Sequence, residues 1–515
     1  MRISDQPSLS SRRDFLRSVG AAAAFAGVGA VPKAGLADSK SDPPLTHLSA
    51  KKLAKLIADR EVSAVEVAEA YLKRIEEVNP KLNAIVQMDA ERVRAEARQA
   101  DKDLSKGATK GPLHGVPFTM KDQMLTKGLI TTNGCPELRS YVPTEDATVV
   151  KRLKDAGGIL LGKTNVPEMC YQSITDNVVY GRTNNPYDLS RTPNGSSGGE
   201  AAIIAACGSP FGLGTDLGDS IRAPAHCCGI AGIKPTCRLV PQTGLLSAFP
   251  LTFYDWNCIG PLARYVEDLE FVLRIVAGPD GGDPYVSPVP LRKSGDVRMA
   301  GLRVALCLDD GATKPTPETT AAVGKAAQAL RDAGANVVEQ RPPMMDQVQD
   351  IWLYNAVPLW TSAARYYPGE YAKLMGVTVD EKRHFSTEFL TKWLELWQKE
   401  KDFGCDRQVE FLATLQQYRA DMMRFMDKYD AILSPVANKP AALHPDPKAP
   451  SEQTAAAQAW ASFKAESGGF CQAHNLTGWP AAVVRAGTSP EGLPIGVQIA
   501  AKPWREDVAL AVAGA

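Results

Sequence analysis

The sequence predicts an α/β fold in which short buried strands alternate with helices. Within residues 147–162, apolar residues at helical spacing are followed by two glycines and then by the short apolar run 159–161. The same order recurs later, where a strand at 304–306 precedes a helix over 318–333 and a second strand at 337–338. Strands and helices that alternate in this way are typical of layered α/β proteins.

Length and composition support this class and exclude others. The chain has 515 residues, 44% of them hydrophobic and 23% charged, with 58 basic against 58 acidic residues. Disordered chains and small disulfide-stapled scaffolds have a different composition. A nucleic-acid-binding surface needs a basic excess that this chain lacks, so we expect no nucleic-acid partner. The length allows one large α/β domain or several ordinary ones.

The N-terminus has the order of an export signal. A charged segment with Arg12 and Arg13 precedes the apolar, small-residue run 18–31 and a small-residue cleavage site at 35–37. The paired arginines indicate the twin-arginine type, and the run is too short and too rich in alanine and glycine to span a bilayer well. We therefore expect a signal peptide over residues 1–37 and a periplasmic or otherwise exported protein, with an amphipathic helix or a membrane anchor as the alternative.

Removal of this signal peptide would leave a nearly neutral protein. The segment holds five of the basic and two of the acidic residues. We expect a linker over 38–44 and no stable membrane anchor in the mature form. All ten cysteines follow residue 37. Because twin-arginine substrates fold before export in a reducing compartment, we expect these thiols to be free and buried, and the adjacent Cys227 and Cys228 to pack rather than to bond.

A capping box predicts where one early helix begins. Ser63 and Glu66 have the spacing of this motif, in which each residue's side chain binds the other's backbone N–H. Ala68, Leu72 and Ile75 follow on one helical face. We therefore expect an amphipathic helix that packs this face on the core.

Residues 342–430 differ in character from the rest of the chain. They hold 15 of the 36 aromatic residues, and Phe389, Trp393 and Trp397 recur at four-residue steps. This spacing predicts helices with an aromatic stripe. The stripe can pack on the sheet as an ordinary helical layer, or it can form a cap that lines an apolar substrate cleft. The two interpretations are compatible, and both stay open.

Glycine and serine are concentrated in residues 191–236, which contain the sequence RTPNGSSGGEAAIIAACGSPFGLGTDLGDSIRAPAHCCGIAGIKPT. The loop 195–199 directly precedes a predicted helix over 200–207, and a second tight stretch follows at 212–220. A loop of this kind at a helix N-terminus brings backbone N–H groups and hydroxyls close to a ligand.

The same loop contains the pattern Gly-x-Ser-x-Gly, which is also found at the nucleophile elbow of α/β-hydrolases. Ser197 would then be the nucleophile. That elbow requires a buried strand directly before it, whereas residues 185–193 have the composition of a loop. The pattern alone is short enough to arise by chance, so we do not favour this interpretation.

The segment as a whole resembles the amidase signature family. Ser-Ser-Gly-Gly, an alanine-rich helix, Gly-Leu-Gly-Thr-Asp, Ser-Ile-Arg-x-Pro and Gly-Ile-Lys-Pro-Thr follow one another with the family's spacing over 191–236. Residues 111–122 resemble the family's lysine loop, and 476–481 and 492–499 resemble its C-terminal strands. The resemblance extends over 45–515 and implies one α/β/α sandwich, with a large mixed sheet covered by helices.

The resemblance implies a catalytic triad without histidine. By motif position Ser220 is the nucleophile, Ser196 is the bridging serine of an unusual cis peptide, and Lys121 is the base. A lysine abstracts a proton only when neutral, so Lys121 must be desolvated and kept away from partners that favour its charge. Ser196 can relay the proton because its hydroxyl both donates and accepts.

The other roles come from the same motif positions. An oxyanion hole is expected from the backbone N–H groups of Leu217, Gly218, Asp219 and Ser220. No metal and no organic cofactor is implied. The remaining predicted residues surround this centre: Ser197, Asp216 and Arg222 as supporting residues, and Met169, Cys170 and Tyr171 as a wall of the acyl pocket. For Asp216 and Arg222, a purely structural ion pair is an equally good interpretation.

Two positions depart from the family pattern. Asn194 stands where glycine is usual, and asparagine tolerates the left-handed conformation. Asp219 stands directly before the nucleophile, where the family has glycine. A carboxylate at about 6 Å from an oxyanion would repel it by roughly 3 kcal/mol at an effective dielectric constant of about 20. We expect Asp219 to point away, to be paired, or to alter activity.

The expected function is hydrolysis of the C–N bond of a small apolar or aryl amide through a serine acyl-enzyme. Carbamates (urethanes) and esters are alternatives, because the same triad serves them. Export and a neutral charge argue against a cytoplasmic amidotransferase subunit that acts on charged tRNA. A non-catalytic or impaired binding protein, disabled by Asp219, is the alternative from another class. The expected partner is a small molecule, and a homodimer is the candidate assembly.

Overall fold

The protein is described by a computed structural model that covers most of the predicted domain. The described residues are 43–246, 255–353, 405–445 and 468–515. The predicted signal peptide over 1–37 lies outside them, as does 354–404 of the aromatic-rich segment, which includes Phe389, Trp393 and Trp397.

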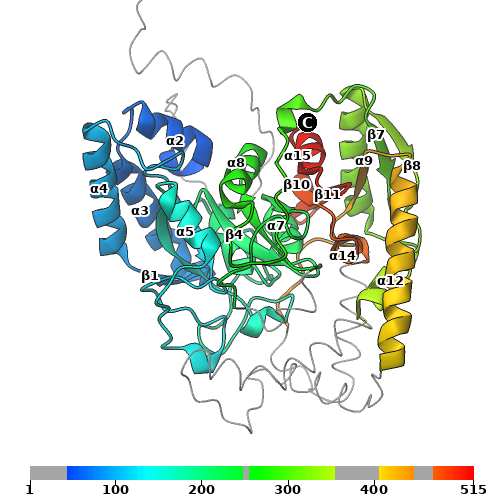
Figure 1. The fold of residues 1–515 in the computed structure, drawn as a ribbon, viewed down its shortest axis with the longest axis horizontal. Helices are drawn as coiled ribbons and strands as arrows, with labels where there is room; N and C mark the ends of the chain where they lie inside the picture. The colour runs from blue at the N-terminus through cyan, green and yellow to red at the C-terminus, as the bar shows by residue number, and fades with distance from the viewer. Residues whose placement is uncertain (1–42, 247–254, 354–404, 446–467) are drawn as a thin grey trace, which may run out of the picture.

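An eleven-stranded mixed sheet crosses the molecule from β1 at one end to β8 at the other (Figure 1). Its order is β1-β3-β2-β4-β6-β5-β10-β11-β9-β7-β8. The strands are β1 (Ile85–Met88), β2 (Pro117–Lys121), β3 (Ile159–Thr164), β4 (Phe211–Asp216), β5 (Ala231–Lys234), β6 (Cys258–Ala263), β7 (Arg303–Leu306), β8 (Asn336–Glu339), β9 (Ala431–Pro435), β10 (Ala481–Thr488) and β11 (Pro494–Ala501). β2 pairs in parallel with β3 and β4, whereas β4 and β6 are antiparallel.

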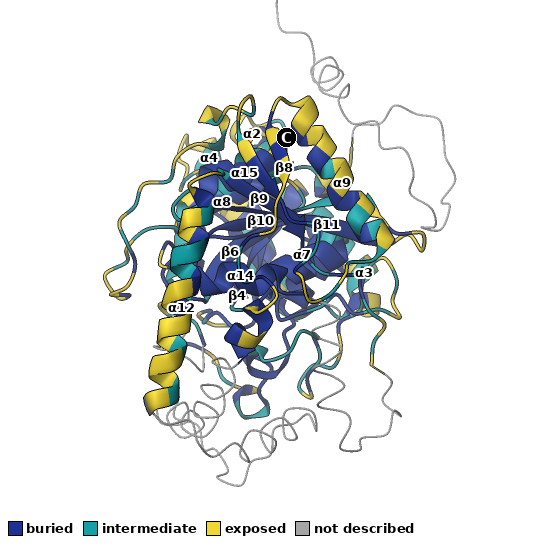
Figure 2. Ribbon diagram, turned by 90° about the vertical axis from the view of Figure 1, so that its right-hand side faces the viewer, coloured by how far each residue is buried: buried dark blue, intermediate teal, exposed yellow. Residues whose placement is uncertain are grey.

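Helices cover this sheet, which confirms the predicted α/β sandwich. α6 and α7 pack together on the strands, and α8 packs with α15 on the strands. The α-helices are α2 (Ala50–Ala58), α3 (Ala64–Leu82), α4 (Ala90–Ser105), α5 (Thr148–Asp155), α6 (Gly198–Ala205), α7 (Arg222–Cys228), α8 (Val266–Val276), α9 (Pro317–Asp332), α12 (Cys405–Met426), α14 (Phe470–Leu476) and α15 (Glu506–Gly514). Short 3₁₀ helices are η1 (Leu45–His47), η2 (Pro136–Leu138), η3 (Glu168–Cys170) and η4 (Ser294–Asp296). Figure 2 shows the buried strands between helices such as α9 and α12, which expose one side.

The two helix–strand units predicted from apolar spacing are present. α5 leads into β3, and β7, α9 and β8 follow in the predicted order, with β7 and β8 paired in parallel. Both helices are followed by a glycine, Gly157 and Gly334, each with φ of 92°. This left-handed conformation suits glycine, so the glycines turn the chain from each helix into the next strand.

The predicted capping box begins α3. The Ser63 side chain accepts from the Glu66 N–H at 3.0 Å, and the Glu66 carboxylate accepts from the Ser63 N–H at 2.8 Å. Ala68, Leu72 and Ile75 are buried on the face that meets the core. Two otherwise unpaired N–H groups at the helix start are thereby satisfied.

A second hydrophobic cluster lies beside the main core of the sheet. It includes Trp352, Trp256, Met169 and Tyr418. Tyr418 of α12 is fully buried, and the Phe411 ring meets Trp256 edge-on with centroids 6.0 Å apart. The described end of the aromatic-rich segment therefore packs its aromatic side chains inward.

Among the helices that the structure describes, none is both long and apolar enough to cross a membrane. Nine of the ten cysteines have side chains that the structure describes, and all nine are free thiols. Eight of them are buried, and Cys170 is half-buried. Cys227 and Cys228 do not bond to each other.

Candidate active site

Lys121 is the last residue of β2 and is fully buried. Its Nζ donates one hydrogen bond to Ser196 Oγ and one to Thr215 Oγ1, both at 2.7 Å. Thr215 Oγ1 in turn donates to Gln123 Oε1 at 2.8 Å. The side-chain nitrogen of Lys121 therefore contacts hydroxyl groups.

The surroundings of Lys121 favour its neutral form. Burial lowers the pKa of Lys121 below its ordinary value, because the ammonium loses its hydration. Neighbouring groups, among them Asp216 and Glu200, raise the pKa and offset part of this effect. A neutral amine next to a serine hydroxyl can accept a proton from it.

The predicted bridging serine lies in a cis peptide. The bond between Gly195 and Ser196 is cis, and Asn194 before it has φ of 67°. Asn194 thus adopts the left-handed conformation that asparagine tolerates, and its side-chain oxygen accepts from the Gly195 N–H at 2.7 Å. Asparagine therefore fits the position where glycine is usual.

Ser220 lies in the loop between β4 and α7, next to the loop that carries Ser196. The Ser197 N–H donates to the Ser220 carbonyl at 3.2 Å, which joins the two loops. The Ser197 hydroxyl contacts the backbone N–H and carbonyl of Thr215, both at 3.4 Å. Ser196 and Ser197 are buried, whereas Ser220 is half-buried and more accessible.

The loop 217–220 has fixed carbonyls and free N–H groups. Each of its four carbonyls accepts a hydrogen bond: Leu217 from Trp352 Nε1, Gly218 from Arg222 Nη2, Asp219 from the Ala223 N–H, and Ser220 from the Ser197 N–H. None of its four N–H groups donates to another described group. A row of unpaired donors beside a serine suits a developing oxyanion.

Asp216 and Arg222 form a buried ion pair at the two ends of this loop. Arg222 Nε and Nη2 bind the two carboxylate oxygens of Asp216 at 2.9 and 2.7 Å. The same carboxylate accepts from the Ile221 N–H at 3.1 Å. Burial opposes its ionisation, but the Arg222 guanidinium and Asn475 hold the pKa of Asp216 at about 2. The pair thus stays charged and holds the loop in place.

Asp219 is 6% exposed, and no described group donates a hydrogen bond to its carboxylate. Burial and, to a smaller extent, the Asp216 carboxylate raise the pKa of Asp219, Arg222 lowers it, and the resulting pKa is about 7. Of the three alternatives expected for Asp219, pairing is therefore not found among the described residues. Its carboxyl is neutral in mildly acidic solution and ionised in alkaline solution.

The residues predicted to contact substrate divide into two groups. Cys170 lies close enough to Lys121 to influence its pKa, and the Cys170 thiol donates to Asn133 Oδ1 at 3.2 Å. Met169 belongs to the second hydrophobic cluster, and Tyr171 packs against it. The structure thus brings Cys170 to the triad and places Met169 and Tyr171 in apolar surroundings.

The sequence prediction missed several residues that shape the site. Gln123 and Thr215 extend the lysine network, and Trp352 lies over Gly218, where an added Cβ would meet its ring at 2.9 Å. Glu200 is buried at the start of α6, hydrogen-bonded to Thr119 and Thr164, and burial raises its pKa to about 7. The one available signal for Glu200 in the sequence was the presence of a charged residue in an otherwise apolar helix.

The structure does not form the alternative nucleophile elbow. No strand precedes Ser197 in the described residues 185–196, where only Arg191 makes an isolated bridge. His226 Nε2 lies 3.1 Å from the Lys439 carbonyl, and its Nδ1 accepts from the Gly496 N–H. This histidine is bound to backbone groups and has no contact with a described serine.

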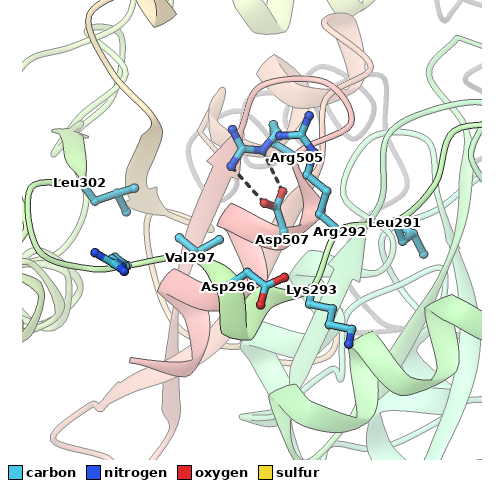
Figure 3. Close-up of a pocket in the computed structure, with 9 residues that line it drawn as sticks. Leu291, Arg292, Lys293, Asp296, Val297, Leu302, Arg505 and Asp507 are labelled. Atoms are coloured by element: carbon cyan, nitrogen blue, oxygen red, sulfur yellow. Dashed lines mark hydrogen bonds and ion pairs between the residues drawn. The ribbon is translucent and has the colours of Figure 1, made fainter.

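A hollow of about 580 Å³ lies elsewhere on the surface (Figure 3). Its lining includes Leu291, Arg292 and the ion pair between Arg505 and Asp507. None of the predicted site residues lines it. Within the described part of the chain, no cluster of His, Cys, Asp and Glu could hold a metal ion.

Comparison with known proteins places the chain among hydrolases. Residues 66–510 match the family described as Amidase. An acylamidase of Rhodococcus erythropolis is 35% identical over 91% of this chain and 94% of its own length. An indoleacetamide hydrolase of Bradyrhizobium diazoefficiens is 34% identical over 92% and 86%. The crystal structure of a bacterial aryl acylamidase superposes with a TM-score of 0.79 at 25% identity, covering 92% of this chain and 96% of that one.

Proposed function

Since the chain belongs to the amidase signature family and hydrolyses amide C–N bonds, we propose that it cleaves small amides with an apolar acyl or aryl group through an acyl-enzyme on Ser220. The observation that carries this proposal is the 2.7 Å hydrogen bond between Lys121 Nζ and Ser196 Oγ, beside a loop whose four N–H groups donate to no described group. A base, a relay and an oxyanion site are the parts that acyl transfer requires.

The first step is attack by Ser220 on the amide carbon. The Ser220 hydroxyl gives its proton to Ser196 Oγ, and Ser196 passes its own proton to the neutral amine of Lys121. Burial lowers the pKa of the lysine, so a larger fraction of the amine is neutral and able to accept this proton. The second hydroxyl partner, Thr215, keeps the amine oriented toward Ser196.

The carbonyl oxygen becomes negatively charged as the Ser220–carbon bond forms. The N–H groups of residues 217–220 stabilise this oxyanion, and one such donor is worth about 3 kcal/mol in the transition state. Because the loop's carbonyls are already bound to other groups, the donors need no rearrangement.

Collapse of the tetrahedral intermediate breaks the C–N bond. Lys121, now protonated, returns its proton through Ser196 to the leaving nitrogen, which departs as a neutral amine or ammonia. Water then attacks the acyl-enzyme with the same base and releases the carboxylic acid. These steps use side chains, backbone donors and water.

An apolar acyl or aryl group suits the surroundings of Ser220. Trp352, Met169 and Leu217 belong to or pack against the second hydrophobic cluster. The names of the similar proteins, acylamidase, indoleacetamide hydrolase and aryl acylamidase, support the same substrate class. Carbamates and esters remain alternatives, because they present the same carbonyl to the triad.

The test is hydrolysis of an anilide panel of rising acyl length, with carbamate and ester analogues of the best acyl group. We expect turnover by the wild-type chain and none by Ser220→Ala. Ser105→Ala, at an exposed serine on α4, is the control. Equal activity of Ser220→Ala and wild type would overturn the mechanism.

Labelling with a serine-reactive fluorophosphonate separates this enzyme from a non-catalytic binding protein. The buried carboxyl of Asp219, to which no described residue donates a hydrogen bond, is the observation that favours this second function. Modification of Ser220 in the wild-type chain supports the enzyme. Failure to label, together with no turnover by wild type or by Asp219→Gly, supports the binding protein.

We also propose export through the twin-arginine pathway, which rests on Arg12, Arg13 and the run 18–31. Fractionation of cells that make the full chain should find the processed protein outside the cytoplasm. Replacement of both arginines by lysine should retain it inside. A processed, exported double variant would contradict this route.

A further inference from the structure

Two thiols meet where β5 and β6 lie side by side. Cys237 follows β5 by three residues, and Cys258 is the first residue of β6. Their sulfur atoms are 3.1 Å apart, and the two residues are only 6% and 4% exposed. The sulfurs are thus about 1 Å from the disulfide bonding distance of about 2.05 Å.

This contact distinguishes the pair from the other described cysteines. Cys227 and Cys228 are neighbours in sequence, but the Cys228 thiol donates to the Pro193 carbonyl. Cys471 donates to Val436 and Gln498, and Cys307 to Asp309. Only between Cys237 and Cys258 does the described structure place one sulfur within hydrogen-bonding distance of another.

A buried lysine lies beside the pair. Lys234 Nζ is 3.7 Å from Cys258 Sγ and donates to the Pro235 carbonyl at 3.0 Å. Lys234 is fully buried, and no described carboxylate forms an ion pair with it. A positive charge beside a thiol favours the thiolate, which is the reactive form.

The same contacts make the two sulfurs unequal. Burial opposes ionisation of Cys237, but the hydrogen bond from Cys258 and the charge of Lys234 lower the pKa of the Cys237 thiol below its ordinary value. Burial raises the pKa of Cys258 well above its ordinary value. Cys237 is therefore the thiol that loses its proton first, while the Cys258 thiol lies 3.1 Å from it and also 3.3 Å from the Pro235 carbonyl, to which it can donate.

We propose that Cys237 and Cys258 form a redox-active dithiol, which a small hydroperoxide converts into a disulfide. The Cys237 thiolate attacks one oxygen of the peroxide, the O–O bond breaks, and hydroxide leaves and takes the thiol's proton to form water. The Cys258 sulfur then attacks the sulfenic acid at Cys237. The S–S bond forms, the S–O bond breaks, and a second water leaves, so two thiols and hydrogen peroxide give one disulfide and two waters.

The backbone near both cysteines is already fixed. The Cys237 N–H donates to the Gly478 carbonyl at 2.9 Å, and Cys258 pairs with Asp216 across β4 and β6. Asp216 is the residue whose carboxylate holds the loop of Ser220. The disulfide would therefore tie the chain directly beside the candidate active site. The proposal does not depend on which substrate the site accepts.

Peptide mapping of the full chain tests the proposal. The protein is reduced, freed of reductant, exposed to hydrogen peroxide at equimolar and tenfold ratios, blocked with an alkylating agent under denaturing conditions and digested with trypsin. Cleavage leaves Cys258 on 239–264 and Cys237 on 223–238, which also holds Cys227 and Cys228. We expect a linked pair of these peptides and the loss of two free thiols.

Single variants assign the bond and provide the controls. Cys237→Ser and Cys258→Ser should each abolish the linked peptide, and Cys237→Ala repeats the test with a smaller, apolar side chain. Cys307→Ser, at a buried cysteine elsewhere, should leave it intact. Persistence of the link in Cys237→Ser would assign it to Cys227 or Cys228 and overturn the proposal. Full retention of both thiols, or oxidation of either to a sulfinic acid without a link, would also overturn it.

A change in the lysine gives an independent readout. Lys234→Met should slow disulfide formation at fixed peroxide by at least tenfold, because the thiolate of Cys237 loses a neighbouring positive charge. Lys151→Met, at an exposed lysine, should leave the rate unchanged. An unaltered rate in a folded Lys234→Met would overturn the role given to the lysine.

Discussion

Lys121 Nζ lies 2.7 Å from Ser196 Oγ, and both side chains are buried. The second hydrogen bond of this amine also goes to a hydroxyl, that of Thr215. Burial lowers the pKa of this amine, and it also lowers the pKa of Lys163, to about 8, although Lys163 lies 3.4 Å from the buried carboxylate of Asp122. The two lysines on neighbouring strands thus differ in their partners, which are hydroxyls for Lys121 and a carboxylate for Lys163.

Replacement of Lys121 by methionine should remove the base while keeping most of the side chain's volume. We expect kcat/KM for the best anilide to fall by about 10²–10⁴-fold, the usual contribution of a general base. Lys151→Met, at an exposed lysine on α5, is the control. A folded Lys121→Met with the wild-type rate would exclude Lys121 as the base.

The pH profile of kcat/KM should have two limbs. Activity rises with pH as Lys121 loses its proton, at a pKa that burial sets below that of an ordinary lysine. It falls again as pH increases through about 7, because ionised Asp219 repels the oxyanion. Stopped assays across the pH range, at saturating and limiting substrate, measure both limbs.

Substitution of Asp219 should remove the falling limb. In Asp219→Asn and Asp219→Gly we expect activity above neutral pH to increase by up to roughly a hundredfold, the equivalent of about 3 kcal/mol. Asp268→Asn is the matched control, since burial also raises the pKa of Asp268, to about 6, at a site that binds the start of α2. If kcat/KM still falls above about pH 7 in Asp219→Asn, a group other than Asp219 causes the fall.

Thr215→Val should lower the stability of the fold and shift the rising, acid limb of the pH profile of kcat/KM. Valine keeps the shape but leaves Gln123 Oε1 without its donor, so we expect the free energy of unfolding to fall by about 1–3 kcal/mol. Loss of a hydroxyl that accepts from Lys121 further disfavours the ammonium, so the acid limb should move to lower pH. Thr126→Val, at a buried hydroxyl bound to the Met124 carbonyl, should leave that limb in place.

Arg222→Met should destabilise the fold strongly. It leaves the Asp216 carboxylate buried and uncompensated, which costs about 3–5 kcal/mol in urea unfolding. Arg303→Met breaks an exposed pair with Asp430 and should cost at most about 1 kcal/mol. Fluorophosphonate labelling of Ser220 should also slow in Arg222→Met, because the Gly218 carbonyl loses its donor. Equal stability losses in the two variants would contradict the assigned role.

Local sequence patterns were sufficient for the elements but not for their arrangement. The capping box of Ser63 and Glu66 predicts the start of α3, and glycines predict the ends of α5 and α9. These signals depend on neighbours within a few residues. The order of the eleven strands depends instead on crossovers and on which apolar faces meet. Nothing in the chain's local spacing therefore predicts that β4 lies between β2 and β6.

The same difference between local signals and long-range contacts explains which site residues the sequence prediction missed. Lys121, Ser196 and Ser220 were predicted from motif positions, and the structure brings the first two into direct contact. Thr215 reaches Lys121 only because β2 and β4 are parallel neighbours. Trp352 reaches the Leu217 carbonyl from a segment more than a hundred residues away. Contacts that cross the sheet or join distant segments have no signature in a single sequence.

The four N–H groups of the loop 217–220, which no described residue binds, are in place before any substrate arrives. Such a row of donors can also bind the carboxylate of the reaction product. A product that stays bound would slow the next turnover. Above about pH 7 the ionised Asp219 in the same loop repels that carboxylate and hastens its departure. We therefore expect aspartate at this position to slow the chemical step and to speed release of the acid above about pH 7.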